Sequence, residues 1–174
     1  SRIHKQSTTV IVTVAGNDHH FAMTYDGAAS PVNNVKLYVD GVLQPTNILS
    51  LNFIAGSLRS QPAQSFDIRT ATVGGSPFSA DEVSVYNRAL SATEIQGIFD
   101  SGAAGKCKPT ATVSPTGQVG SWPGDGNAND ITGSNNGTLT NGAGFAAGKV
   151  GQGFQFDLNQ NISIPDDSSL DLTN

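Results

Sequence analysis

Short stretches of the chain alternate between apolar and polar residues, with the two-residue period of a β-strand that buries one face. In residues 8–14, Val10, Val12 and Val14 fall on the same side of the predicted strand. The same period recurs in residues 19–25, 35–39, 83–85, 154–156 and 162–164. The pattern predicts a chain built mainly of short β-strands.

One hairpin is predicted from a turn signal inside this pattern. Asp40 and Gly41 separate the strand at residues 35–39 from Val42 and Leu43, which resume the alternation. An Asp-Gly pair favours a two-residue hairpin turn, because glycine accepts the positive φ that such a turn requires.

A single helix is predicted over residues 91–100. Ser91 and Glu94 have the spacing of a capping box, in which each side chain accepts a hydrogen bond from the other residue's backbone N–H. Apolar residues follow at helical spacing, namely Ile95, Ile98 and Phe99.

Composition and charge exclude several classes of protein. The 174 residues are enough for one all-β domain with a real core. The net charge of −5 and the pI near 4.9 argue against a nucleic-acid partner, which needs a clustered basic face. No apolar run approaches the roughly 20 residues that span a bilayer, so no membrane partner is expected. The single Cys107 cannot form an internal disulfide.

Residues 19–27, 35–41 and 81–91 resemble the closing half of a LamG-like module, the laminin G-like member of the concanavalin A-like jelly-roll family. Residues 19–27 and 35–41 are similar to two paired strands of that family, in which a tryptophan usually precedes the two histidines; here Asp18 stands in its place. Residues 81–91 resemble the family's closing strand and the beginning of its following helix.

Later segments resemble the opening strands of the same family, so the order of the two halves is reversed. The similar segments are residues 122–130 and 151–165. Because an open half-sandwich would leave an apolar face in water, we expect the halves to pack together. The resemblance implies an all-β, concanavalin A-like jelly-roll β-sandwich of two antiparallel sheets. Residues 1–174 would form one permuted sandwich, with residues 1–100 like a C-terminal half, 101–117 a linker, and 118–174 like an N-terminal half.

The reversed order favours a chain that crosses the boundary of two tandem modules. The resemblance implies a secreted or cell-surface, modular bacterial protein. The family's intervening strands are absent, so either residues 1–14 and 48–68 supply substitutes or self-association with another copy fills the incomplete sheet edge.

Oxygen-bearing side chains recur at every second position after residue 124. Asp125, Asn127 and Asn129, followed by Asp130, can turn toward one hard cation, for which Ca²⁺ is the natural candidate. The alternative is an Asx-rich turn without a metal. Calcium is often bound at a sandwich edge in the wider family, which adds three candidate ligands that are otherwise exposed carboxylates at strand ends: Asp157, Asp81 and Glu82.

Carbohydrate binding would use an exposed aromatic side chain with polar neighbours. The candidates are Tyr38, Trp122 and Tyr86, each of which can belong to the core instead. Tyr38 faces away from Leu37 and Val39 and is the better surface candidate. Trp122 fits the interior of the sandwich better than a sugar platform.

No catalytic residues are predicted. A glycoside hydrolase usually needs two facing carboxyl groups, and the chain has only two glutamates, Glu82 and Glu94, of which Glu94 serves the helix cap. The sequence therefore favours a non-catalytic carbohydrate-binding or adhesion module over a glycoside hydrolase. The remaining alternative is a structural spacer repeat without a ligand.

Overall fold

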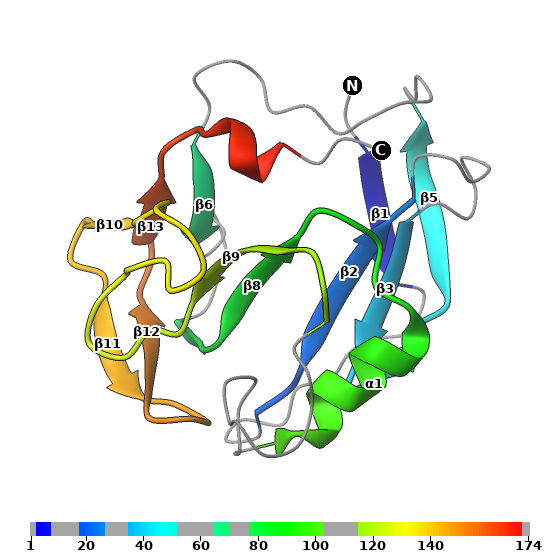
Figure 1. Ribbon diagram of the computed structural model, residues 1–174, viewed down its shortest axis with the longest axis horizontal. Coiled ribbons are helices and arrows are strands. Elements are labelled where there is room, and N and C mark those ends of the chain that lie inside the picture. The colour runs from blue at the N-terminus through cyan, green and yellow to red at the C-terminus, as the bar shows by residue number, and fades with distance from the viewer. Residues whose placement is uncertain are drawn as a thin grey trace.

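The computed structural model describes residues 3–7, 18–26, 35–51, 65–69, 77–102 and 115–171. These residues form short antiparallel strands, one α-helix and a 3₁₀ turn, which confirms the predicted all-β architecture with a short helix (Figure 1). The elements are β1 (Ile3–Ser7), β2 (Phe21–Tyr25), β3 (Val35–Val39), β4 (Val42–Leu43), β5 (Thr46–Leu51), β6 (Phe66–Arg69), β7 (Phe78–Ala80), β8 (Val83–Tyr86), α1 (Ala92–Asp100), β9 (Gln118–Trp122), β10 (Thr138–Thr140), β11 (Gly144–Ala147), β12 (Gln152–Phe156), β13 (Asn161–Ile164) and the turn η2 (Ser168–Leu170). The strand predicted at residues 8–14 lies outside the described residues.

The hairpin predicted from Asp40 and Gly41 is confirmed. Both residues have positive φ, 50° and 77°, and they connect β3 directly to β4. Asp40 also joins the turn to the start of β2. Its carboxylate accepts hydrogen bonds from the His20 backbone N–H at 2.9 Å and from Nδ1 of His19 at 2.8 Å.

Strands from before and after residues 103–114 share three of the antiparallel sheets. β6 pairs with β13, β7 with β12, and β8 with β9. β6, β8, β9, β12 and β13 lie in the left and centre of Figure 1, whereas β1, β2, β3 and β5 lie on the right with α1. The predicted linker, residues 101–117, falls mostly outside the described residues, and the proposed division of the chain stays a prediction.

The apolar core lies among the strands that these pairings bring together. Its fully buried members are Trp122, Phe154, Phe156, Ile162 and Ile164. Residues of the earlier strands pack against them: the Phe66 ring lies 5.8 Å from the Trp122 ring, and the Phe78 ring stacks on Phe156 at 5.0 Å.

Gly120 makes room for the central tryptophan. A Cβ atom at this position would lie 2.4 Å from the indole ring of Trp122, so a side chain there would displace the ring. The indole Nε1 donates to the backbone carbonyl of Asn135 at 2.8 Å, which satisfies its polar group inside the core.

The loop between β9 and β10 is built around the buried carboxylate of Asp130. One oxygen accepts hydrogen bonds from the backbone N–H groups of Ser121 and Thr132, both at 2.9 Å. The other accepts from the backbone N–H of Asn135 at 3.3 Å. Asp130 therefore connects β9 to the segment whose carbonyl holds Trp122.

The helix α1 begins at the predicted capping box. Ser91 Oγ accepts from the Glu94 N–H at 3.2 Å, and Glu94 Oε2 accepts from the Ser91 N–H at 2.8 Å. Ile95 is fully buried, and the Phe99 ring lies 6.3 Å from the His20 ring on β2. No helix among the described residues is long and apolar enough to cross a membrane.

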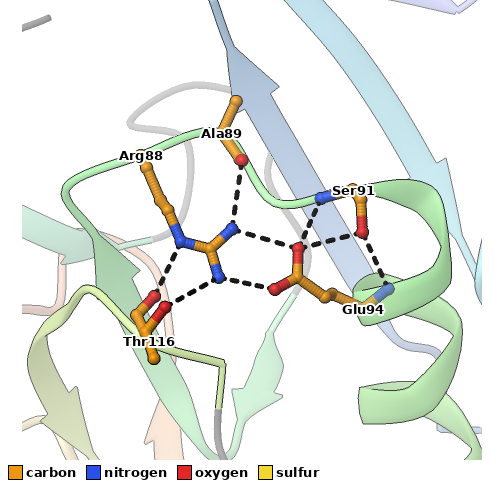
Figure 2. Close-up of polar contacts among 5 residues, drawn as sticks. All are labelled: Arg88, Ala89, Ser91, Glu94 and Thr116. Carbon is orange, nitrogen blue, oxygen red and sulfur yellow. Dashed lines mark hydrogen bonds and ion pairs between the residues drawn. The ribbon is translucent and has the colours of Figure 1, made fainter.

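Arg88 extends the capping box into a larger polar network (Figure 2). Its guanidinium meets both carboxylate oxygens of Glu94, with N···O distances of 3.0 and 2.5 Å. It also donates from Nε to the backbone carbonyl of Thr116 at 2.9 Å. The Arg88 hydrogen bonds, followed by those from Ser91, lower the pKa of Glu94 from 4.5 to about 2.

We expect the Asp130→Ala variant to lose about 3 kcal/mol of unfolding free energy, because three backbone N–H groups near the core lose their acceptor. The Asp130→Asn variant keeps one acceptor oxygen and should lose less than half as much. Urea denaturation followed by tryptophan fluorescence measures both. Equal unfolding midpoints for Asp130→Ala and the wild type would contradict the role assigned to this carboxylate.

The Glu94 network should make stability depend on acid pH. Because the pKa of Glu94 in the folded protein, about 2, lies below the ordinary 4.5, its ionised form stabilises the fold. This contribution is complete above the ordinary value and is lost as the pH falls toward 2. Thermal melts from pH 7 to pH 2 should therefore show the wild type and Glu94→Gln converging in acid. A constant difference between the two melting temperatures would contradict this prediction.

Candidate functional site

A small pocket lies between the end of β2 and the segment that connects β8 to α1. Its volume is about 70 Å³. The residues that line it are Met23, Thr24, Tyr25, Tyr86, Asn87, Arg88 and Leu90.

The second wall of the pocket is held by the chain that leads into β9. The Asn87 backbone N–H donates to the carbonyl of Gly117 at 2.8 Å. Arg88 binds Thr116 beside it, and Tyr86 pairs with Gln118 after a register shift in the β8–β9 ladder. The residues after β8 are thereby fixed relative to the start of β9.

The side chains that line the pocket combine aromatic rings with uncharged polar groups. Tyr25 and Tyr86 are both half-buried, and Asn87 contributes an amide, whereas Thr24 is buried. Burial, and secondarily the nearby Asp26 carboxylate, raise the pKa of Tyr25 above 10.0, so its phenol is neutral at neutral pH. Such a surface can pack against the C–H groups of a ligand and exchange hydrogen bonds with its hydroxyls.

Arg88 contributes a guanidinium whose N–H groups are already engaged (Figure 2). Nε donates to the Thr116 carbonyl, and Nη1 donates to the Ala89 carbonyl and to Glu94. Nη2 donates to Glu94 and to the Thr116 hydroxyl. These contacts match the five donors that a guanidinium carries.

Of the three aromatic residues predicted to bind carbohydrate, the structure places Tyr86 at this pocket. Trp122 is fully buried in the core, and Tyr38 is only 4% exposed. The prediction of these two residues as sugar platforms is therefore corrected.

The burial of Tyr38 follows from the position of α1. Tyr38 pairs with Ala22, which lies on the same face of β2 as His20 because alternate residues share a face. His20 contacts Phe99 of α1, so the helix covers the face that carries Tyr38. The alternation that set Tyr38 apart from Leu37 and Val39 was correct, but both faces of β3 are partly covered.

The predicted calcium ligands around residues 125–130 mostly serve their own loops. Asn127 accepts from the Asn129 N–H at 2.9 Å, which is the Asx turn that was the alternative to a metal site. Asp125 accepts from the Gln152 N–H at 2.8 Å. Both oxygens of Asp130 face the three N–H groups described above, which leaves its carboxylate turned toward donors instead of a cation.

The three additional candidates lie at turns. Asp81 Oδ2 accepts from the Val150 N–H at 2.9 Å, and burial, with Asp125 contributing, raises the pKa of Asp81. The Glu82 backbone has a φ of 55°, and the Asp157 N–H donates to Gln160 at 2.7 Å.

The acidic members of the seven predicted ligands do not form a group of three that could hold a metal ion among the described residues. Oδ1 of Asp81 is buried without a hydrogen-bond partner among the described residues, which favours a nearby cation. Calcium binding stays a prediction.

Sequence reasoning missed most of the pocket. Tyr25 was recognised only as a strand residue, and Asn87 and Arg88 only as part of the segment that resembles the family's closing strand. One signal could have found them. Tyr25, Asn87 and Arg88 all lie at or just after the end of a strand, where side chains more often line a surface site than fill the core.

Comparison with known proteins gives one match. Neither the curated proteins nor the solved structures yield a match to the chain. A family model described as the concanavalin A-like lectin/glucanases superfamily matches residues 4–96, which span β1 to the first turns of α1. The match confirms the resemblance drawn from the sequence and the predicted β-sandwich fold; the reversed order of the halves stays a prediction. The chain therefore belongs to the concanavalin A-like lectin/glucanase superfamily, as a LamG-like domain.

Proposed function

We propose that the chain is a non-catalytic carbohydrate-binding module of an extracellular, modular protein. The observation that carries the proposal is the pocket, in which Tyr25 and Tyr86 line the space together with the polar residue Asn87. Lectins and glucanases, the two groups that the superfamily description joins, both act on carbohydrates. Fold alone does not assign a ligand, so the argument depends on the chemistry of the pocket.

The volume of the pocket suits part of a sugar instead of a complete ring. A cavity needs about 10–15 Å³ of such space to hold one water molecule, so about 70 Å³ corresponds to roughly five to seven small groups. A hydroxymethyl or acetamido substituent would enter it while the ring lies across the opening. Met23, which lines the pocket and is 67% exposed, supplies apolar surface for the ring at that opening.

Binding without cleavage is favoured by the chemistry of the described residues that line the pocket. Glycoside hydrolysis usually needs two carboxyl groups on opposite sides of the bond, and none of these described residues carries one. Glu94 lies behind Arg88 with both oxygens hydrogen-bonded, and its pKa of about 2 leaves no proton for general acid catalysis at neutral pH.

A glycan array tests the proposal with the labelled chain, in parallel with added calcium and with a chelator. We expect saturable binding to one class of glycan. The Tyr86→Ala and Asn87→Ala variants should each weaken binding by about tenfold or more, because each removes a contact surface of the pocket. Tyr38→Phe is the matched control, since this buried tyrosine lies under α1 and its loss of a hydroxyl should leave binding unchanged.

Circular dichroism first establishes that the variants are folded, and each result of the array can then be interpreted. Glycan binding that survives both pocket substitutions would place the site elsewhere on the chain. Absence of binding in both the calcium and the chelator arm would favour the structural spacer. Binding that the chelator abolishes would support the calcium prediction.

A further inference from the structure

One residue that lines the pocket, Arg88, carries a positive charge that an acidic side chain of the same chain neutralises. Arg88 lines the pocket, and its guanidinium forms a two-point ion pair with Glu94, at N···O distances of 3.0 and 2.5 Å. A free guanidinium at such a position would be an effective receptor for a carboxylate, because its fork of donors matches two carboxylate oxygens. Glu94 occupies that role from within the chain.

The carboxylate of Glu94 is held in place by the helix cap as well as by the arginine. Its Oε2 accepts hydrogen bonds from the Ser91 backbone N–H at 2.8 Å and from the Ser91 hydroxyl at 2.9 Å. The Ala89 and Thr116 contacts hold the guanidinium on its other sides (Figure 2). A ligand carboxylate would have to displace several contacts at once to reach the Arg88 donors.

One neighbouring charge acts in the same direction. The Asp26 carboxylate is close enough to Tyr25 to contribute to the raised pKa of that phenol, so it adds negative potential on the Tyr25 side of the pocket. The chain as a whole has a net charge of −5. Both features disfavour an anionic ligand.

We propose that the pocket selects uncharged glycans and that Glu94 is a specificity-determining residue, because its ion pair with Arg88 withholds the guanidinium from acidic sugars. This inference rests on the proposed carbohydrate binding and names the ligand class of the same pocket. Neutral sugars would bind through the tyrosines and Asn87, while uronic and sialic acids would find the guanidinium of Arg88 already paired with Glu94.

Two sugars that differ at a single group test the selectivity of the wild type. Glucose and glucuronic acid, and likewise galactose and galacturonic acid, differ in having a hydroxymethyl or a carboxylate at C6. As competitors of the glycan found on the array, the neutral sugars should be at least about tenfold more effective than the corresponding acids. This measurement needs no variant.

The Glu94→Gln variant tests the role of the ion pair. Glutamine can still accept the Ser91 N–H through its amide oxygen, but it leaves the charge of Arg88 uncompensated. We expect at least a tenfold gain in competition by the acids, with little change for the neutral sugars, and we expect the gain to fall in high salt. The Ser91→Ala variant is the matched control: it weakens the helix cap while retaining Glu94, and should show no gain.

Distinct results separate the two proposals. Absence of any glycan binding by the wild type would overturn the proposed function itself. Glycan binding in which the acids compete as well as the neutral sugars, or better, would overturn only the selectivity inferred here. A folded Glu94→Gln variant without a gain for acids, or an equal gain in Ser91→Ala, would overturn the role of Glu94.

Discussion

Trp122 lies where strands from the two parts of the sequence meet, and its burial is the constraint on which the remaining structure depends. The β8–β9 ladder brings the indole against residues that come before it in the chain, such as Phe66, while Phe154 and Phe156 close the core from later strands. Neither set of strands could bury its apolar face alone. The contact between β8 and β9 also positions one wall of the pocket, because Asn87 and Arg88 form hydrogen bonds to Gly117 and Thr116 immediately before β9. Core and pocket wall therefore share the β8–β9 ladder, and a change that loosens this ladder also displaces the wall that carries Tyr86 and Asn87.

A single carboxylate connects the start of the helix to the electrostatics of the pocket. Glu94 caps α1 through Ser91 and neutralises Arg88 on the pocket side. A half-exposed ion pair contributes little to stability by itself. Here the capping contacts hold the carboxylate in one position, so less side-chain freedom is lost when the ion pair forms. Glu94 thus determines the charge that a ligand encounters, and a substitution at Glu94 changes both this charge and the helix cap.

Strands and helices with a clear hydrophobic period could be predicted from the sequence. The burial of individual side chains could not, because it depends on how these elements pack on one another. The alternation in residues 154–164 predicted β12 and β13, and the capping box predicted the start of α1. The alternation around Tyr38 indicated its face correctly, but not that α1 would cover it. In the same sheet, Met23 is largely exposed although it lies in an apolar pattern. Period identifies the faces of a strand; only the arrangement of neighbouring elements decides which face meets solvent, and the pocket arises from that arrangement.

The Asp-rich and Asn-rich loop shows why ligand spacing alone predicts a metal site poorly. Oxygen atoms at alternate positions can converge on a cation, but they can equally accept backbone N–H groups of a tight loop, which is itself rich in unsatisfied donors. Asp130 and Asn127 are used in this second way, each by amides of nearby residues. A metal site needs open space in front of the side-chain oxygens, whereas a tight loop places backbone N–H groups there. The spacing of the residues in the sequence does not distinguish these two arrangements. The same reasoning applies to Arg88: a guanidinium near a pocket indicates an acidic ligand only where the protein has not already supplied the acid, and here Glu94 supplies it.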